Sequence, residues 1–278
     1  YTVHGLDTDP AEIEAAREHI RSRGLYGAVS AVHWGGQRLP YADDLVNMMV
    51  VEERGGVSDR DIRRALAPGG VAYVKSGGSW RRMNASWPAE IDEWTHYLYD
   101  PTNNAISSDR RVGPPTKMQW SCGPRYARSH EHLSSVSAMV SAGGRLFYII
   151  DEGPISSVYL EPEWRLVARD AFNGRLLWKR PIPHWESHLR GFRSGPPEIG
   201  RRLVAAGDRV FVTPEYGGPV LALEAGTGRR IGTYPGTKGA REILYEDGVL
   251  YVVADNLEPS EHRESSEWFD RLAPELQH

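Results

Sequence analysis

A short segment that occurs at residue 168 and again at residue 222 constrains the fold of this chain more than any other feature. The first copy, 168–178, has the sequence ARDAFNGRLLW, and the second, 222–232, has the sequence ALEAGTGRRIG. In each copy a predicted strand, in which apolar and polar residues alternate, leads into a turn that ends in glycine. A second strand with the same alternation follows. This pattern predicts that the second half of the chain is built from repeated β-hairpins.

Another glycine-containing turn precedes each copy, at 143–144 and at 207–208, and a third at 247–248 begins a unit that the sequence does not complete. Repeats of about 45 residues that consist only of hairpins are typical of β-propellers, whose rings of six to eight blades need about 300 residues. Residues 116–278 therefore predict a partial, all-β set of about three blades. The rest of the ring is expected from a larger propeller polypeptide or from protein partners.

Residues 1–75 follow a different pattern, in which strands alternate with helices. Asp9-Pro10 opens a helix that Gly24 ends, and a second helix is predicted over 59–66. The predicted strands lie at 2–7, 28–33, 45–51 and 71–74. The strand at 45–51 is apolar except for Asn47, which predicts burial on both faces. The alternation indicates a partial, Rossmann-like α/β domain.

Three motifs in this part resemble class I S-adenosylmethionine methyltransferases: VHGLD at 3–7, LPYADDLVNMMVV at 39–51 and LAPGGVAYV at 66–74. In that family the acidic residue that ends the second strand binds the ribose hydroxyls of S-adenosylmethionine, and the resemblance gives this role to Asp7. A carboxylate can accept hydrogen bonds from both hydroxyls. The alternative is that Asp7 only ends a strand and helps to cap a helix.

Residues 76–115 are predicted to be a linker followed by the lead-in to the propeller. Their stretch EWTHYLYDPTNNAIS, at 93–107, resembles the segment before the first blade of pyrroloquinoline-quinone-type propellers. Burial of Trp94 against the first blade is the expected role there. Taken with the blade repeats, the chain resembles fusion proteins of planctomycete-type bacteria, which join a methyltransferase-like domain to such a propeller.

The repeated motif is expected to hold neighbouring blades together. A Trp at the end of the last strand of one blade covers apolar area on the next, and at roughly 25 cal/mol per Å² its burial contributes a few kcal/mol. The second copy has Gly232 where Trp would stand, so Tyr234 is the expected replacement. The structural residues of the motif are Ala168, Asp170, Gly174, Trp178, Ala222, Glu224 and Gly228.

A candidate metal site combines two histidines with two carboxylates. His130 and His132 project from one face if they lie on a strand, and Asp151 and Glu152 follow the next hairpin. The alternative is that these side chains only form hydrogen bonds in polar loops. The resemblance implies S-adenosylmethionine or pyrroloquinoline quinone as cofactor. Cys122 is the single cysteine, so the vicinal disulfide of the quinone family cannot form.

Net charge and hydropathy exclude some function classes. The net charge of -4 and the pI near 6.2 argue against a nucleic-acid partner, and no apolar run is long enough to span a membrane. The compartment is not encoded in these residues, although the propeller resemblance favours an extracytoplasmic or periplasmic one. The leading hypothesis is a propeller binding or scaffold module fused to a vestigial methyltransferase-like domain. The alternatives are an active methyltransferase whose propeller recruits substrate, and a quinone- or metal-dependent oxidoreductase.

Overall fold

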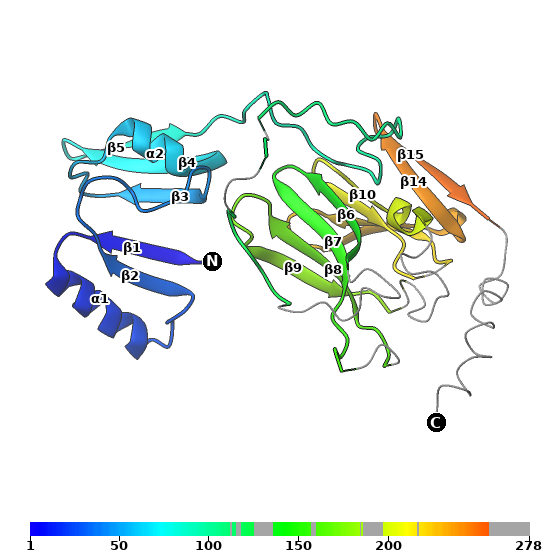
Figure 1. The fold of residues 1–278 in the computed structure, drawn as a ribbon, viewed down its shortest axis with the longest axis horizontal. Helices are drawn as coiled ribbons and strands as arrows, with labels where there is room; N and C mark the ends of the chain where they lie inside the picture. The colour runs from blue at the N-terminus through cyan, green and yellow to red at the C-terminus, as the bar shows by residue number, and fades with distance from the viewer. Residues whose placement is uncertain are drawn as a thin grey trace. The chain divides into compact units, whose positions relative to one another are not determined.

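The structure is a computed structural model that describes residues 1–111, 113–114, 118–124, 136–156, 160–183, 185, 197–215 and 217–255 (Figure 1). The chain divides into two compact units, Tyr1–Pro88 and Ala89–His278. No helix among the described residues has the length and apolar character needed to cross a membrane.

The first unit contains two small sheets and two helices. Its elements are β1 (Val3–Asp7), α1 (Pro10–Ser22), β2 (Val29–His33), β3 (Val46–Val51), α2 (Asp59–Ala65), β4 (Leu66–Ser76) and β5 (Ser79–Asn84). Strand β1 pairs in parallel with β2, and β3 pairs in parallel with β4, whose other edge takes β5 in antiparallel orientation. The predicted α/β alternation is therefore present, with these two helices as its helical part.

Local sequence explains both helices. The Asp9 side chain accepts a hydrogen bond from the Ala11 amide at 2.8 Å, and Pro10 occupies the first helical position of α1, where its missing N–H has no cost. On α2 the Ser58 hydroxyl accepts from the Asp61 amide at 3.1 Å. Each helix buries isoleucine against its sheet, Ile13 and Ile20 in α1 and Ile62 in α2.

Two sequence predictions for this unit were wrong. Strand β3 is not buried on both faces, because α2 covers only one of them: Met49 is 8% exposed, whereas Met48 and Val50 are 61% and 56% exposed. The segment after residue 76 is not all linker either. Gly77 and Gly78, with φ angles of 56° and 81°, turn the chain back into β5.

The second unit consists of antiparallel sheets, as the hairpin repeats predicted. The first sheet comprises β6 (Val136–Ala142), β7 (Arg145–Asp151), β8 (Trp164–Asp170) and β9 (Leu176–Pro181). The short 3-10 helix η1 (Pro197–Arg202) precedes the second sheet, which comprises β10 (Leu203–Ala206), β11 (Arg209–Val212), β12 (Val220–Glu224) and β13 (Arg230–Tyr234). After η2 (Pro235–Thr237) come β14 (Ala240–Glu246) and β15 (Val249–Ala254), which pair with each other. Two four-stranded meanders and a hairpin in series have the architecture of propeller blades.

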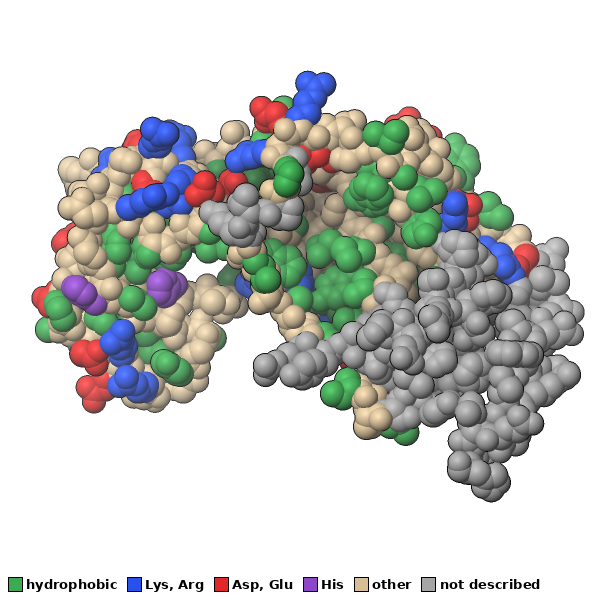
Figure 2. All heavy atoms as spheres, viewed as in Figure 1, with side chains coloured by type: hydrophobic (Ala, Val, Ile, Leu, Met, Phe, Trp, Pro, Cys, Tyr) green, Lys and Arg blue, Asp and Glu red, His purple; other side chains and the backbone are tan. Residues whose placement is uncertain are grey.

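The sheets of the second unit pack face to face. Alternate residues of the second sheet point to opposite neighbours: Leu203 and Val210 belong to a core shared with the first sheet, and Val204 and Phe211 to a core shared with β14 and β15. The second sheet is therefore enclosed on both faces. Figure 2 shows hydrophobic side chains gathered over β7 and β8, where Tyr148, Ile150 and Val167 form a further cluster.

Candidate functional site

Asp7 ends β1 and is exposed, at the carboxyl edge where β1 and β2 run in parallel. Its Oδ1 accepts a hydrogen bond from the Asp9 amide at 2.8 Å, and its carbonyl oxygen accepts from the Trp34 amide at 2.8 Å. One carboxylate oxygen therefore shapes the turn into α1. This contact fits the strand-ending role, and the exposed position at the sheet edge is compatible with a ribose ligand.

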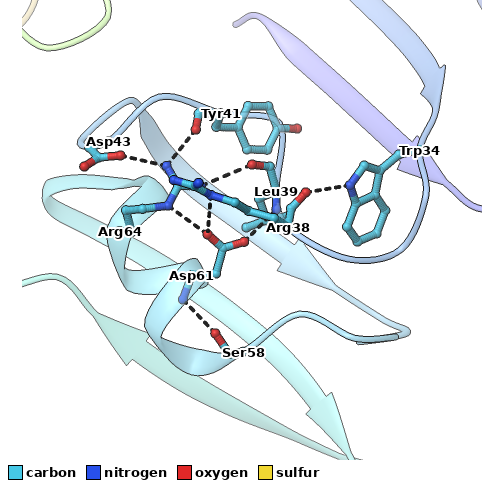
Figure 3. A network of polar contacts seen from close by, with 8 residues as sticks. All are labelled: Trp34, Arg38, Leu39, Tyr41, Asp43, Ser58, Asp61 and Arg64. Carbon is cyan, nitrogen blue, oxygen red and sulfur yellow. Dashed lines mark hydrogen bonds and ion pairs between the residues drawn. The ribbon is translucent and has the colours of Figure 1, made fainter.

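The loop between β2 and β3 is fixed by a guanidinium from α2 (Figure 3). The Arg64 side chain donates through Nη1 to the carbonyl oxygen of Tyr41 at 2.7 Å and through Nη2 to that of Leu39 at 3.1 Å. It also donates to Oδ1 of Asp43 and Oδ1 of Asp61, both at 2.8 Å. These contacts join the loop between β2 and β3 to helix α2.

Asp61 completes this network. Its Oδ2 accepts from the Leu39 amide at 2.6 Å. Burial acts to raise the pKa of the Asp61 carboxyl, but this hydrogen bond and the Arg64 guanidinium outweigh it, so the pKa lies below its usual value. The carboxylate is thus charged and structural. Sequence reasoning missed this network, although Asp61 and Arg64 are spaced as an i,i+3 pair on a helix.

The turn in the first copy of the blade motif packs against the indole ring of Trp120, which lies outside the motif. Asp170 accepts through Oδ1 from the amides of Phe172 at 2.9 Å and Asn173 at 3.1 Å. Gly174 has a φ of 70°, and a Cβ placed on it would lie 2.4 Å from the Trp120 ring. The Trp120 indole donates to the carbonyl oxygen of Ala171 at 2.9 Å, so the ring is both stacked and hydrogen-bonded.

The second copy repeats this arrangement one sheet further on. Gly228 has a φ of 69°, and a Cβ there would lie 2.6 Å from the ring of Trp178. The Trp178 indole donates to the carbonyl oxygen of Ala225 at 2.8 Å. Glu224, in the place of Asp170, accepts from the Thr227 hydroxyl at 2.5 Å. Trp178 belongs to β9 of the first sheet, and its side chain covers the turn between β12 and β13 of the second sheet.

The remaining motif residues lie on the strands. Ala168 and Ala222 are buried, at 0% and 3% exposure, in the two cores on either face of the second sheet. Tyr234, the expected replacement for the absent Trp, is 37% exposed, and its ring centre lies 6.5 Å from that of Phe211. Tyr234 therefore packs on Phe211 of the sheet to which it belongs.

Residues 94–96 contact the first strand of each of the three sheets described in the second unit. The Ser141 amide in β6 donates to the carbonyl oxygen of Trp94 at 2.7 Å, and the Trp94 amide donates to the Ser141 hydroxyl at 2.9 Å. The Ala205 amide in β10 donates to the carbonyl oxygen of Thr95 at 3.0 Å. We call residues 94–96 the clip. They tie the edges of the sheets to one segment that lies far away in sequence.

His96 makes the third contact of the clip. Its Nε2 accepts from the Tyr245 amide in β14 at 3.1 Å, so the proton is assigned to Nδ1, which lies 2.7 Å from the Thr95 hydroxyl. The side chain is 2% exposed. Burial lowers the pKa of His96 to about 4, against a smaller opposing effect of the Asp100 charge. The sequence predicted burial of Trp94 in this segment, but Trp94 is 36% exposed and the histidine is the buried residue.

The candidate metal residues are only partly within the described part of the chain. His130 and His132 lie outside it. Asp151, the last residue of β7, accepts through Oδ1 from the amides of Gly153 at 2.8 Å and Glu163 at 2.9 Å. Glu152 pairs with Lys179 at 2.7 Å. Across the described ranges no three metal-ligating side chains come together.

The sequence resemblance implies two cofactors, pyrroloquinoline quinone and S-adenosylmethionine. Asp151 and Glu152 have loop-forming and ion-pair contacts, and Cys122 is an exposed free cysteine. The described residues therefore do not fit the binding of pyrroloquinoline quinone with its metal. Asp7 fits one contact to S-adenosylmethionine, through the face of the carboxylate that does not bind the Asp9 amide.

No protein-family model matches the chain, and no curated protein matches it either. Among solved structures, the [4+2]-cyclase SpnF is 24% identical over 28% of this chain and 33% of its own, with a TM-score of 0.24. The quinohemoprotein alcohol dehydrogenase from Comamonas testosteroni is 13% identical over 58% of this chain and 23% of its own, with a TM-score of 0.37. BamB from Moraxella catarrhalis is 16% identical over 40% of this chain and 30% of its own, with a TM-score of 0.25. The chain thus spans a third or less of the length of these proteins, and the blade-type fold of its second unit rests on its own repeated sheets.

Proposed function

We propose that this chain is a binding or scaffold module, in which quinoprotein-type propeller blades are joined to a vestigial methyltransferase-like α/β unit. The observation that carries the proposal is the outer face of β15. Val249, Tyr251 and Val253 are 48%, 55% and 58% exposed, whereas the alternate residues Leu250 and Val252 pack on the second sheet. An exposed apolar stripe of this kind is typical of a protein interface.

The chemistry of the partner follows from the packing of the preceding sheets. The first two sheets pack through apolar residues at alternate strand positions, and β14 and β15 pack on the second sheet in the same way. The exposed apolar residues of β15 provide a surface on which one more sheet can pack in the same way. Its partner is therefore a further blade-type sheet, from the remainder of a larger propeller polypeptide or from another protein.

A methyltransferase is the second candidate, because Asp7 is exposed at the carboxyl edge of a parallel strand pair. It requires S-adenosylmethionine binding through that carboxylate. A metal-dependent oxidoreductase is the third, and it depends on whether His130 and His132 approach Asp151 and Glu152.

A photo-crosslinking amino acid at Tyr251 tests the leading proposal in the full-length protein. The expected cross-links map to apolar strand residues of a blade-type sheet, and the same group at Met139, which is 50% exposed on β6, gives a different set. Identical cross-links from both positions would argue against a specific face on β15. Titration with S-adenosylmethionine separates the second candidate, since micromolar binding that is lost in Asp7→Ala favours a methyltransferase.

A further inference from the structure

The sheet β3–β4–β5 has one covered face and one bare face. On the covered face Met49, Ala72 and Met83 are 8%, 0% and 3% exposed, and they share a cluster with Ile62 of α2. The bare face carries the alternate residues of the same strands. Apolar side chains that are this exposed on a three-stranded sheet indicate a surface with a partner.

The registers place the residues of the bare face in rows across the strands. Met48 of β3 lies beside Val71 of β4, and Val50 lies beside Tyr73. Their exposed fractions are 61% for Met48 and 56% for Val50, and both neighbours on β4 are half-buried. These two rows form an apolar patch along β3 and β4.

The β5 side of the face adds positive charge. Arg82 lies beside Tyr73, and Trp80, 46% exposed, lies beside Lys75. The Lys75 ammonium is 5.9 Å from the centre of the Trp80 ring. The charged residues on this face of β4 and β5, Lys75 and Arg82, are both basic and both exposed.

The size of the face matches one helix. Three strands about 4.8 Å apart present a surface roughly 10 Å wide, and an α-helix with its side chains is about 10 Å in diameter. The two described helices are already engaged, because α1 packs on Ala31 of β2 and α2 packs on the opposite face of this sheet. A second copy of the chain is a poor occupant, since face-to-face pairing would bring Lys75 and Arg82 of each copy against like charge.

We propose that this face is a docking site for an amphipathic α-helix of a partner protein, with apolar residues over Met48 and Val50 and acidic residues alongside Lys75 and Arg82. The proposal concerns the first unit alone, so it stands or falls independently of the β15 face. Binding combines burial of the apolar rows with charge complementarity along one flank.

A pair of synthetic peptides tests this directly on the full chain. The first is a labelled 16-residue helix with leucine at i, i+3, i+4 and i+7 positions and glutamate along one flank, and the second has lysine in place of each glutamate. Fluorescence anisotropy is expected to give micromolar binding for the acidic peptide and at least tenfold weaker binding for the basic one. Met48→Glu with Val50→Glu should remove binding, whereas Ile231→Glu, at an exposed position on β13, should not.

Reversal of the charges gives the sharper test. In Lys75→Glu with Arg82→Glu the preference should invert toward the basic peptide, and circular dichroism should show an unchanged fold because both positions are exposed. Equal binding of the two peptides, binding that survives Met48→Glu with Val50→Glu, or no binding at all would overturn the proposal. So would a concentration-dependent dimer of the chain that Met48→Glu dissolves, because the occupant would then be a second copy.

Discussion

At the scale of single residues, Gly174 and Gly228 are constrained by an indole ring as well as by their own turns. Each has a positive φ, which favours glycine, and each lies under a tryptophan at a distance that leaves no room for a Cβ. The two constraints can be separated, because Gly207 has a φ of 53° in the turn between β10 and β11, and a Cβ added to it would meet no atom within 4 Å. Gly207 therefore serves as the control for Gly228, because it has the positive φ without the contact to an indole.

Gly228→Ala should destabilise the second unit by about 2–4 kcal/mol, because the strain of a left-handed alanine adds to overpacking against Trp178. Gly207→Ala should cost only about 1 kcal/mol, since it has the backbone strain without the clash. Urea unfolding of both variants measures the difference. If both variants lost the same free energy of unfolding, the Trp178 ring would move aside without cost. Its contact with Gly228 would then not stabilise the packing of the two sheets.

His96 gives stability a pH dependence whose sign is fixed by the direction of its shift. The ordinary pKa of 6.5 falls to about 4 in the folded state, so between these values the unfolded chain binds more protons. The contribution of His96 is therefore complete above about pH 6.5 and is lost as the pH falls toward 4, by roughly 3 kcal/mol at 1.36 kcal/mol per pKa unit.

The measurement is urea unfolding of the native chain and of His96→Gln at pH 7, 6, 5 and 4.5. Gln can still accept a hydrogen bond from the Tyr245 amide but does not titrate in this range. The variant should lose less stability than the native chain as the pH falls. Parallel pH profiles would show that the acid sensitivity comes from other groups.

At the scale of elements, the sequence predicted those strands and helices that have a local sequence pattern. It did not predict contacts between segments that are far apart in the sequence. Turn glycines and alternating strands located the hairpins of the second unit, and Asp9-Pro10 located the start of α1. Strand β5 was missed because Trp80, Arg81 and Arg82 are exposed and have no apolar alternation. A bare sheet face removes the pattern on which strand prediction depends.

The candidate sites followed the same rule. The motif residues at the turns were identifiable from the repeat, but the partner of Gly174 was not, because Trp120 lies far from it in sequence. The clip has no local signal at all, since residues 94–96 form hydrogen bonds with strands that begin at 136, 203 and 240. Long-range backbone pairing of a non-repetitive segment leaves no periodicity in the sequence.

Ser141→Ala tests the clip as an element. It removes the acceptor of the Trp94 amide and should destabilise the second unit by about 1 kcal/mol. Ser22→Ala, at the exposed C-terminal end of α1 in the first unit, removes a hydroxyl that donates to the nearby His19 carbonyl oxygen and should have almost no effect on stability. When Ser141→Ala is combined with His96→Ala, which removes the acceptor of the Tyr245 amide, the loss should be less than additive by more than about 0.5 kcal/mol, because both contacts order the same segment. Strict additivity in the double-mutant cycle would show that the two contacts act independently.

At the scale of the whole molecule, the hydrophobic clusters formed by the described residues do not mix residues from the two units. The clusters of the first unit draw on residues between Leu6 and Ala85, and those of the second on residues between Val136 and Val252. The compact units divide after Pro88, beyond β5, while the predicted domain limit at 75 stays a prediction. Separate cores predict separate unfolding, since cooperativity requires shared buried contacts.

Calorimetry of the full chain is therefore expected to show two transitions, each sensitive to a mutation in one core. Ile62→Ala removes a fully buried side chain between α2 and its sheet, and Leu203→Ala removes one between the first two sheets of the second unit. Each should cost about 2–5 kcal/mol and lower the Tm of one transition while leaving the other within error. Hydrogen exchange followed by mass spectrometry assigns the transitions, because Ile62→Ala should raise exchange only in residues 1–88. A single transition that both variants lower to the same extent would mean that the two cores unfold as one.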